Sequence, residues 1–389
     1  MSADYMTGAR VPRNMVEERW AAVSAAMERE GLEALLVAGR GQIGQYGNVF
    51  YLSGLLPFND VGHTYVFLRR GEEAQIVAGK RDQVVADVYA VEDLIWHAPV
   101  ADMPAIGTGA SALAPQISAL IEKHGLTGER IGIVGMSRIM PVADLEAIRA
   151  LQPAAEFVDA DALLAPLKAV KSARELELYK DACEIADEGF QVLVEAMVPG
   201  ATEAAIAAKV EESVRARGSL ATIIHVLPGH VFTRPPTLRA VPENEMVHGY
   251  VECVAPNGYW VEKGTMFALG SVPDRSMEVY ETLERAYVAG ERLLRAGVSA
   301  ADVARAVGAE AEAGGCTQGI WAGHGVGIDH DSPVLSVEDP TPLAEGMVIS
   351  LHPHLYDGDY GGFTIDQYTI TDGDPLRHSR FERKLYTVD

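Results

Sequence analysis

The sequence predicts two domains of different class, an α/β domain over residues 1–165 and an α+β domain over residues 166–389. Three observations lead to this division. Short apolar runs alternate with one-faced helical patterns in the first part, a long capped helix begins near residue 172, and later strand-like runs follow one another without intervening helices. A chain of 389 residues with 48% apolar content has enough apolar side chains for two cores.

Helices that alternate with short strands predict the first domain. Residues 15–31 carry Trp20, Val23 and Met27 at spacings of three and four, which is typical of a one-faced helix, and Gly31 ends it. Two further helical patterns cover 114–125 and 143–152. This alternation implies a mixed sheet covered by helices. The apolar runs predicted to be strands are ALLVAG (34–39), VFYLSG (49–54), TYVFLRR (64–70), AQIVAG (74–79) and RIGIVG (130–135).

A long helix opens the second domain, where Ser172 and Glu175 form a capping box. Its apolar residues recur on one face up to Met197, and a turn then leads to a second helix capped by Thr202 or Gly200. The strands that follow indicate an α+β domain with largely antiparallel pairing. The remaining elements are predicted as strands 221–227, 246–255 and 259–270, helices 276–296 and 299–314, and strands 346–356 and 363–371.

Composition narrows the partners and the compartment. The count of 32 Lys+Arg against 55 Asp+Glu gives a net charge of −23, which repels nucleic acid and anionic membranes and leaves a small-molecule substrate as the expected partner. No stretch approaches the ~18 to 20 apolar residues of a membrane span. Because no apolar run follows the first positive charge, we expect no secretory signal and a cytoplasmic protein. The three cysteines are far apart in the sequence and are expected to be reduced.

Several segments resemble one known superfamily, in its order. They are NVFYLSGL (48–55), LKAVKSARELELYKDACEIADEG (167–189), MVPGATEAAIA (197–207), AGHGVGIDHDSP (322–333) and LAEGMVISLHP (343–353). Through them the chain resembles the creatinase/aminopeptidase P/methionine aminopeptidase superfamily over nearly its whole length. The resemblance implies an α+β pita-bread catalytic domain, a smaller creatinase-type α/β domain before it, and a homodimer.

The resemblance also locates a metal site. Peptidases of this superfamily bind two divalent metals through two aspartates, one histidine and two glutamates. On this chain the resemblance places Glu252 and Glu262 at the positions of the two aspartates, and His324 at the position of the histidine. The positions of the two glutamates are occupied by His352 and Ile365. Since isoleucine cannot coordinate an ion and two ions depend on shared carboxylates, these departures argue against the usual dinuclear site.

Several functions remain open on this basis. The favoured interpretation is creatinase-like: without a cofactor, a histidine acts as general acid and base while carboxylates hold the substrate, and a C–N bond other than a peptide bond is hydrolysed in a small polar or cationic metabolite. One alternative is a lyase, by β-elimination, with a single Fe, Zn or Mn ion held by Glu252, Glu262, His324 and His352. The others are a metal-dependent Xaa-Pro peptidase and an inactive pita-bread binding module.

Candidate catalytic residues are those whose side chains can exchange a proton or hold a charged group, and histidine does so near neutral pH. His352 is predicted to face the pocket in preference to His354. The full catalytic set is His324, His352, Glu262, Glu252, His225 and His230.

Substrate-binding candidates are residues that can grip a charge or pack on a ring. Arg234 either binds a substrate carboxylate or forms a salt bridge that holds the adjacent Pro-Pro turn, and Tyr259 either lines the pocket or belongs to the core. The resemblance adds a loop that reaches the partner's active site in dimeric relatives. The full set is Arg234, Tyr259, Asp331, His354, Asp366, Phe58 and Asn59.

Overall fold

The structure is a computed structural model that describes residues 11–55, 63–79 and 113–388. The chain divides into two compact units, one of Met1–Lys168 with Ile328–His330 and one of Ala169–Gly327 with Asp331–Asp389. The sequence placed the division after residue 165. Among the described helices, none is both long and apolar enough to cross a membrane.

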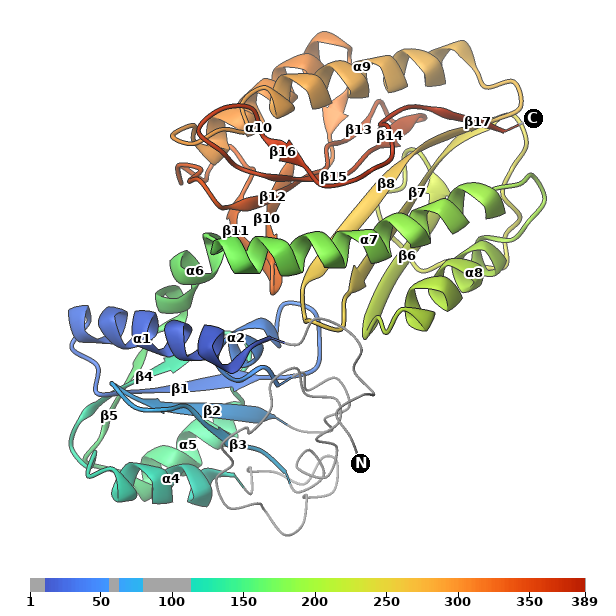
Figure 1. Cartoon of the computed structure of the whole chain (residues 1–389). Helices are drawn as coiled ribbons and strands as arrows, with labels where there is room; N and C mark the ends of the chain where they lie inside the picture. The colour runs from blue at the N-terminus through green and yellow to red at the C-terminus, as the bar shows by residue number, and fades with distance from the viewer. Residues whose placement is uncertain (1–10, 56–62, 80–112, 389) are drawn as a thin grey trace. The chain divides into compact units, whose positions relative to one another are not determined.

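The first unit is built on a five-stranded mixed sheet in the order β3-β2-β1-β4-β5 (Figure 1). β1 pairs antiparallel with β2 and parallel with β4, so the predicted mixed sheet is confirmed. The central strand β1 is buried along its whole length, as expected of an apolar run without polar alternation. The strands are β1 Ala34–Gly39, β2 Thr64–Arg69, β3 Gln75–Val77, β4 Arg130–Val134 and β5 Glu156–Asp159, and the helices are α1 Arg13–Arg29, α2 Gly47–Ser53, α4 Ala114–Lys123, α5 Val142–Leu151 and α6 Asp161–Ala169.

One segment of this unit differs from its prediction. VFYLSG was expected to be a strand, but it forms helix α2, which ends at Gly54 in the left-handed conformation at φ 69°. Val49, Phe50 and Leu52 are all fully buried. A helix buried on all sides shows the same uninterrupted apolar run as a buried strand, so periodicity cannot separate the two.

Four helices cover the sheets of the second unit. α7 packs on β7 and β8 and α8 packs on β6, while α9 packs on β12, β13 and β14 (Figure 1). The predicted capping box of Ser172 and Glu175 is confirmed at the start of α7, and the Thr202 hydroxyl caps α8 by accepting the N–H of Ala205. The helices are α7 Ala173–Ala196, α8 Glu203–Ala216, α9 Asp274–Glu291 and α10 Ala300–Ala313.

The strands of the second unit form three sheets, in the orders β17-β8-β7-β6, β11-β10-β12-β15-β16 and β14-β13-β9. The pairs β6–β7, β7–β8, β10–β12, β12–β15, β15–β16, β13–β14 and β13–β9 are antiparallel and β17–β8 is parallel, in agreement with the predicted α+β class. The strands are β6 Ala221–Pro228, β7 Glu245–Val254, β8 Trp260–Leu269, β9 Thr317–Gln318, β10 Gly323–Gly327, β11 Asp329–Val334, β12 Val348–Leu351, β13 His354–Tyr356, β14 Gly361–Phe363, β15 Asp366–Thr369, β16 Leu376–Arg377 and β17 Tyr386–Val388.

Two of these sheets meet where β8 and β15 approach each other. Gly264 and Ile365 form an isolated antiparallel bridge that joins them. On one side of this junction, the register of β7 and β8 sets Glu252 opposite Glu262. On the other side, the register of β10 and β12 sets His324 opposite Ser350. The junction therefore brings together polar side chains from strands that are far apart in the sequence.

Candidate metal centre

Glu262 lies on β8 and is 3% exposed, so its carboxylate needs partners inside the protein. The hydroxyl of Ser350, on β12, donates a hydrogen bond of 2.6 Å to its Oε2 atom. The other oxygen, Oε1, lies 3.9 Å from Nε2 of His324. The two oxygens of this carboxylate are thus directed at different neighbours.

His324 and His352 approach Glu262 from the second sheet. The two imidazole rings meet edge to face with their centroids 4.9 Å apart. Nδ1 of His324 lies 2.8 Å from the carbonyl oxygen of Gly325, which places the proton of the neutral ring on Nδ1 and a lone pair on Nε2. A histidine that binds a metal through one nitrogen commonly donates the other N–H to a carbonyl in this way.

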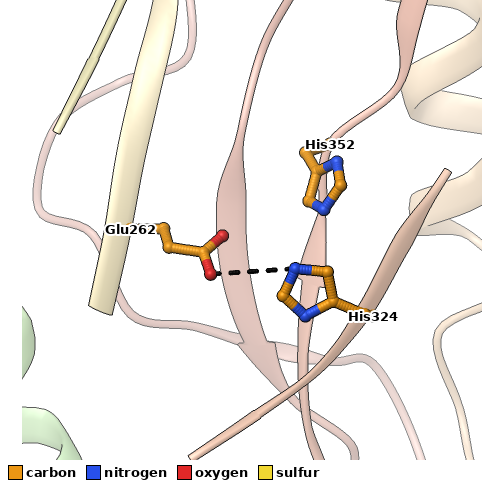
Figure 2. Close-up of side chains that lie close together, drawn as sticks. All are labelled: Glu262, His324 and His352. Carbon is orange, nitrogen blue, oxygen red and sulfur yellow. Dashed lines mark ion pairs between the residues drawn. The ribbon is translucent and has the colours of Figure 1, made fainter. Parts of the chain in front are cut away.

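These three side chains point toward one another, as Figure 2 shows. One ligand atom from each of Glu262, His324 and His352 can be chosen so that all lie within 4.8 Å of one another. Ligand atoms about 2 Å from a tetrahedral zinc ion lie about 3.3 Å from one another, so these three atoms would approach one another when an ion binds. Two imidazoles and one carboxylate form a known donor set for zinc and iron. The residues present therefore fit a divalent ion.

A second carboxyl group, that of Glu252, faces Glu262 across the β7–β8 pair. Burial is the main cause that holds the pKa of Glu252 well above its usual range, and the charge of Glu262 adds to it. Burial also raises the pKa of Glu262, although His324 and Ser350 oppose that rise. Two neighbouring carboxylates in a protein interior repel each other, and a cation between them relieves the repulsion.

Three other histidines of this unit, including the candidates His225 and His354, are buried against aromatic rings. The ring of His225 meets Tyr250 edge to face at 4.5 Å, and Tyr250 in turn lies 5.1 Å from Phe363. Burial lowers the pKa of His225 and of His354 to about 4, and that of His248 to about 3. At neutral pH these rings are uncharged, so they lack the proton that a general acid must donate.

Arg234 forms an ion pair with Glu203, at the start of α8. Its Nη1 and Nη2 atoms donate to the two carboxylate oxygens of Glu203 at 2.6 and 2.7 Å, and Thr237 donates its N–H and hydroxyl to the same carboxylate. Burial by itself raises the pKa of Glu203, but these hydrogen bonds outweigh it and lower that pKa. This arrangement corresponds to the salt bridge beside the Pro-Pro turn, and a substrate-binding role for Arg234 stays a prediction.

We expect Arg234→Ala to destabilise the chain by about 1.5 to 3 kcal/mol at pH 7, the range for a hydrogen bond to a charged group. Because the pKa of Glu203 is lowered by folding, its contribution is present above the unfolded pKa of about 4.3 and is lost as pH falls through the folded value. Urea unfolding at pH 7 and pH 3 measures this, with a smaller loss expected at pH 3. An equal loss at both values would contradict an ionic role for the pair.

Other predicted substrate-binding residues have structural partners. The Tyr259 hydroxyl donates to Glu175 of α7 at 3.3 Å, and its ring meets that of Tyr179 edge to face. The carboxylate of Asp331 lies 3.5 Å from the buried ammonium of Lys171.

Of the remaining predicted residues, His230 is exposed just beyond the end of β6. His354 lies 3.2 Å from the Gly229 carbonyl oxygen through its Nε2 atom. Phe58 and Asn59 are outside the described residues. The structure brings Glu262, His324 and His352 together into one cluster; the roles of the other candidates stay predictions.

Asp366, another predicted residue, is paired with two cationic side chains. It is fully buried, and it accepts hydrogen bonds from Lys263 Nζ at 2.6 Å and from Arg377 Nε at 2.9 Å. Burial lowers the pKa of Lys263, while Asp366 opposes that shift. Lys263 follows Glu262 along β8, so strand alternation directs the two side chains to opposite faces.

Ser350 is the residue of this site that the sequence did not single out. Its position two residues before His352 was the available signal, because residues two apart on a strand lie on the same face. Serine is common on strands for many other reasons, and only the hydrogen bond to Glu262 distinguishes this one.

Two family models match the chain. The first, described as metallopeptidase family M24, covers residues 177–372. The second, described as the creatinase/prolidase N-terminal domain, covers residues 19–170. Together they agree with the resemblance inferred from the motifs, and they confirm the predicted two-domain pita-bread architecture.

Relatives and solved structures point in the same direction. The Xaa-Pro dipeptidase of Pyrococcus horikoshii is 23% identical over 96% of this chain and 99% of its own length. The Xaa-Pro dipeptidase of Pyrococcus furiosus is 28% identical over 59% of this chain and 68% of its own. The crystal structure of the P. horikoshii prolidase superposes with a TM-score of 0.78 at 22% identity, over 95% of this chain and 99% of that one. At such identity the structure shows the fold alone.

These comparisons correct two expectations. The metal-free, creatinase-like hydrolysis of a C–N bond other than a peptide bond was wrong as the favoured function, because the relatives are named for peptide-bond hydrolysis. The expectation of no cofactor was wrong for the same family reason, and the cluster of Glu262, His324 and His352 supplies a donor set for a metal. The expectation of a hydrolase stands at the level of the family. Since the first family model matches more than half of the residues of this chain, the chain belongs to metallopeptidase family M24.

Proposed function

We propose that this chain is a metal-dependent dipeptidase that hydrolyses the peptide bond before a C-terminal proline. The observation that carries the proposal is the convergence of Glu262, His324 and His352 on one point in a chain of the M24 family. Relatives named Xaa-Pro dipeptidase supply the substrate class, one of them matching over 96% of this chain and another over 69%.

In this proposal Glu262, His324 and His352 hold the ion. When bound, a divalent ion polarises a carbonyl oxygen and lowers the pKa of water. The chain's own residues orient the ligands: Ser350 holds one oxygen of Glu262, and the carbonyl of Gly325 fixes the tautomer and the ring orientation of His324.

The surroundings of His352 suit an apolar ring on the substrate. The centroid of the Phe363 ring lies 5.8 Å from that of His352, and Tyr250 lies 5.1 Å beyond Phe363. The apolar pyrrolidine ring of proline can pack against these aromatic side chains. Proline has no backbone N–H, so it needs no hydrogen-bond acceptor there.

The test is an assay of Ala-Pro and Gly-Pro hydrolysis by the purified chain, with Ala-Ala as the matched substrate that lacks proline. Activity should depend on added Zn²⁺, Mn²⁺ or Co²⁺ and should disappear after chelation. Hydrolysis that survives exhaustive chelation would contradict the metal requirement, and equal rates on Ala-Ala would contradict the specificity for proline.

The predicted homodimer is part of this proposal. Light scattering on the eluted protein should give twice the mass of the 41.7 kDa chain, and a single-chain mass would contradict it.

A further inference from the structure

The way Glu262 is held bears on how many ions the site can bind. A two-ion centre, which the superfamily resemblance implies, needs carboxylates that bridge ions about 3.5 to 4 Å apart, with one oxygen on each ion. In Glu262 only Oε1 is directed at the histidine cluster, because Oε2 accepts the 2.6 Å hydrogen bond from Ser350. To bridge two ions, Glu262 would have to give up that hydrogen bond inside the protein.

The space beside Glu262 on the same face of β8 is filled by side-chain carbons of Tyr250 and Ile365 and by the backbone carbonyl oxygen of Gly249. Gly264 is two residues further along the strand and shares that face. A Cβ atom placed on Gly264 would lie 2.8 Å from Cγ2 of Ile365 and would also collide with Cβ of Tyr250. Ile365, Tyr250 and Phe363 pack there as a buried apolar cluster. None of the side-chain atoms that crowd Gly264 can coordinate a metal.

Asp366, which follows Ile365 in the sequence, is already paired with other side chains. Asp366 points into the ion network with Lys263 and Arg377, and both of its oxygens are used there. Glu252 remains as one further carboxyl group opposite Glu262. With Glu252 included, the described residues of this unit bring four donor side chains to the junction, which is enough for one ion.

We infer that this centre binds a single divalent ion of the zinc class through Glu262, His324 and His352, with Ser350 confining Glu262 to one coordinating oxygen. The inference rests on the proposed metal dependence, and it changes the expected centre from two ions to one. Two histidines and a glutamate with a remaining open position are the ligand set of several single-zinc peptidases. Ser350 is a positioning residue here, since it acts through Glu262.

The first experiment uses the unaltered full chain without substrate. After removal of metal, it is titrated with Zn²⁺ or with Co²⁺ and desalted, and bound metal is counted by mass spectrometry while the visible absorption of Co²⁺ is followed. We expect both signals to saturate at about one ion per chain. Saturation at two ions, or the magnetic coupling of a two-Mn²⁺ centre in its electron paramagnetic resonance spectrum, overturns the inference, and so does the absence of binding.

Variants then assign the ligands. His352→Ala should abolish tight binding of Co²⁺, while His378→Gln, at a half-buried histidine whose Nε2 atom lies 2.7 Å from the Thr369 hydroxyl, should leave binding unchanged. Ser350→Ala should still bind about one ion, but about 10- to 100-fold more weakly and with an altered Co²⁺ spectrum. Its matched control is Ser213→Ala, whose hydroxyl donates only to its own helix at Val210. Unchanged affinity and spectrum in Ser350→Ala would remove Ser350 from the inference.

The outcomes separate this inference from the proposed function. A chain that binds one ion but does not hydrolyse Ala-Pro contradicts the dipeptidase proposal and keeps the single-ion centre. A chain that hydrolyses Ala-Pro with two bound ions contradicts the single-ion centre and keeps the dipeptidase proposal. If His352→Ala fails to fold, the titration of the unaltered chain still decides the number of ions.

Discussion

Glu262→Gln should reduce dipeptide hydrolysis by more than about 100-fold while the chain remains folded. Mutation of a residue that only supports a metal ligand typically lowers metal affinity or activity by about 10- to 100-fold. Glu262 is a proposed ligand itself, so its loss should lower activity further. Glutamine has the same shape and can still accept the hydrogen bond from Ser350, but it carries no charge for the ion. Steady-state kinetics and the Co²⁺ titration of the variant measure the two losses.

The same substitution has an opposite consequence for the metal-free fold. The half-buried Glu252 faces the buried Glu262, and removal of the Glu262 charge relieves the repulsion between the two carboxylates. We therefore expect the melting temperature of metal-free Glu262→Gln to equal or exceed that of the unaltered chain. The control is Glu177→Gln, at an exposed position of α7, which should change neither activity nor stability. Full activity of Glu262→Gln would show that Glu262 is not a ligand.

Asp366→Ala should destabilise the second unit by about 3 to 5 kcal/mol, the cost of removing one partner from a buried ion pair. Asp366 is 0% exposed and Lys263 is 1% exposed, so the ammonium cannot reach water when its partner is lost. Arg377 loses the same carboxylate, but its side chain is 27% exposed and its charge can still be solvated, so most of the cost falls on Lys263. Urea unfolding at pH 7 gives the free energy, and Asp372→Ala at an exposed site is the control.

A partial rescue distinguishes a charge effect from a packing effect. Lys263→Met combined with Asp366→Leu replaces the buried pair by apolar groups of similar volume, which is often neutral. We expect the double variant to recover part of the loss seen in Asp366→Ala. A loss in Asp366→Ala below about 1 kcal/mol would indicate that the pair is worth no more than an exposed one.

Much of the architecture was predictable because it depends on local patterns. The capping box of Ser172 and Glu175, the one-faced helix it begins, and the alternation of short strands with helices in the first unit each come from residues close in sequence, and the structure has them. VFYLSG was mispredicted because a helix buried on all sides has no periodicity to reveal it. The favoured chemistry failed for another reason: substitutions at the ligand positions argued against the usual dinuclear site, and a metal-free mechanism was then preferred to a single-ion one, although histidine and glutamate are themselves good ligands.

The sequence by itself determined the two domains and, through its motifs, the family, and the resemblance to that family proposed His324, His352 and Glu262 as site residues before any coordinates were known. Only the tertiary structure decided which of those residues meet. Glu262 and Ser350 are separated by 88 residues, and the register of β10 with β12 and the junction of β8 with β15 bring them to 2.6 Å. Tertiary packing also placed Asp366 in an ion network and Arg234 on Glu203. Pairing between distant strands depends on register and side-chain packing across sheets, which no local pattern encodes.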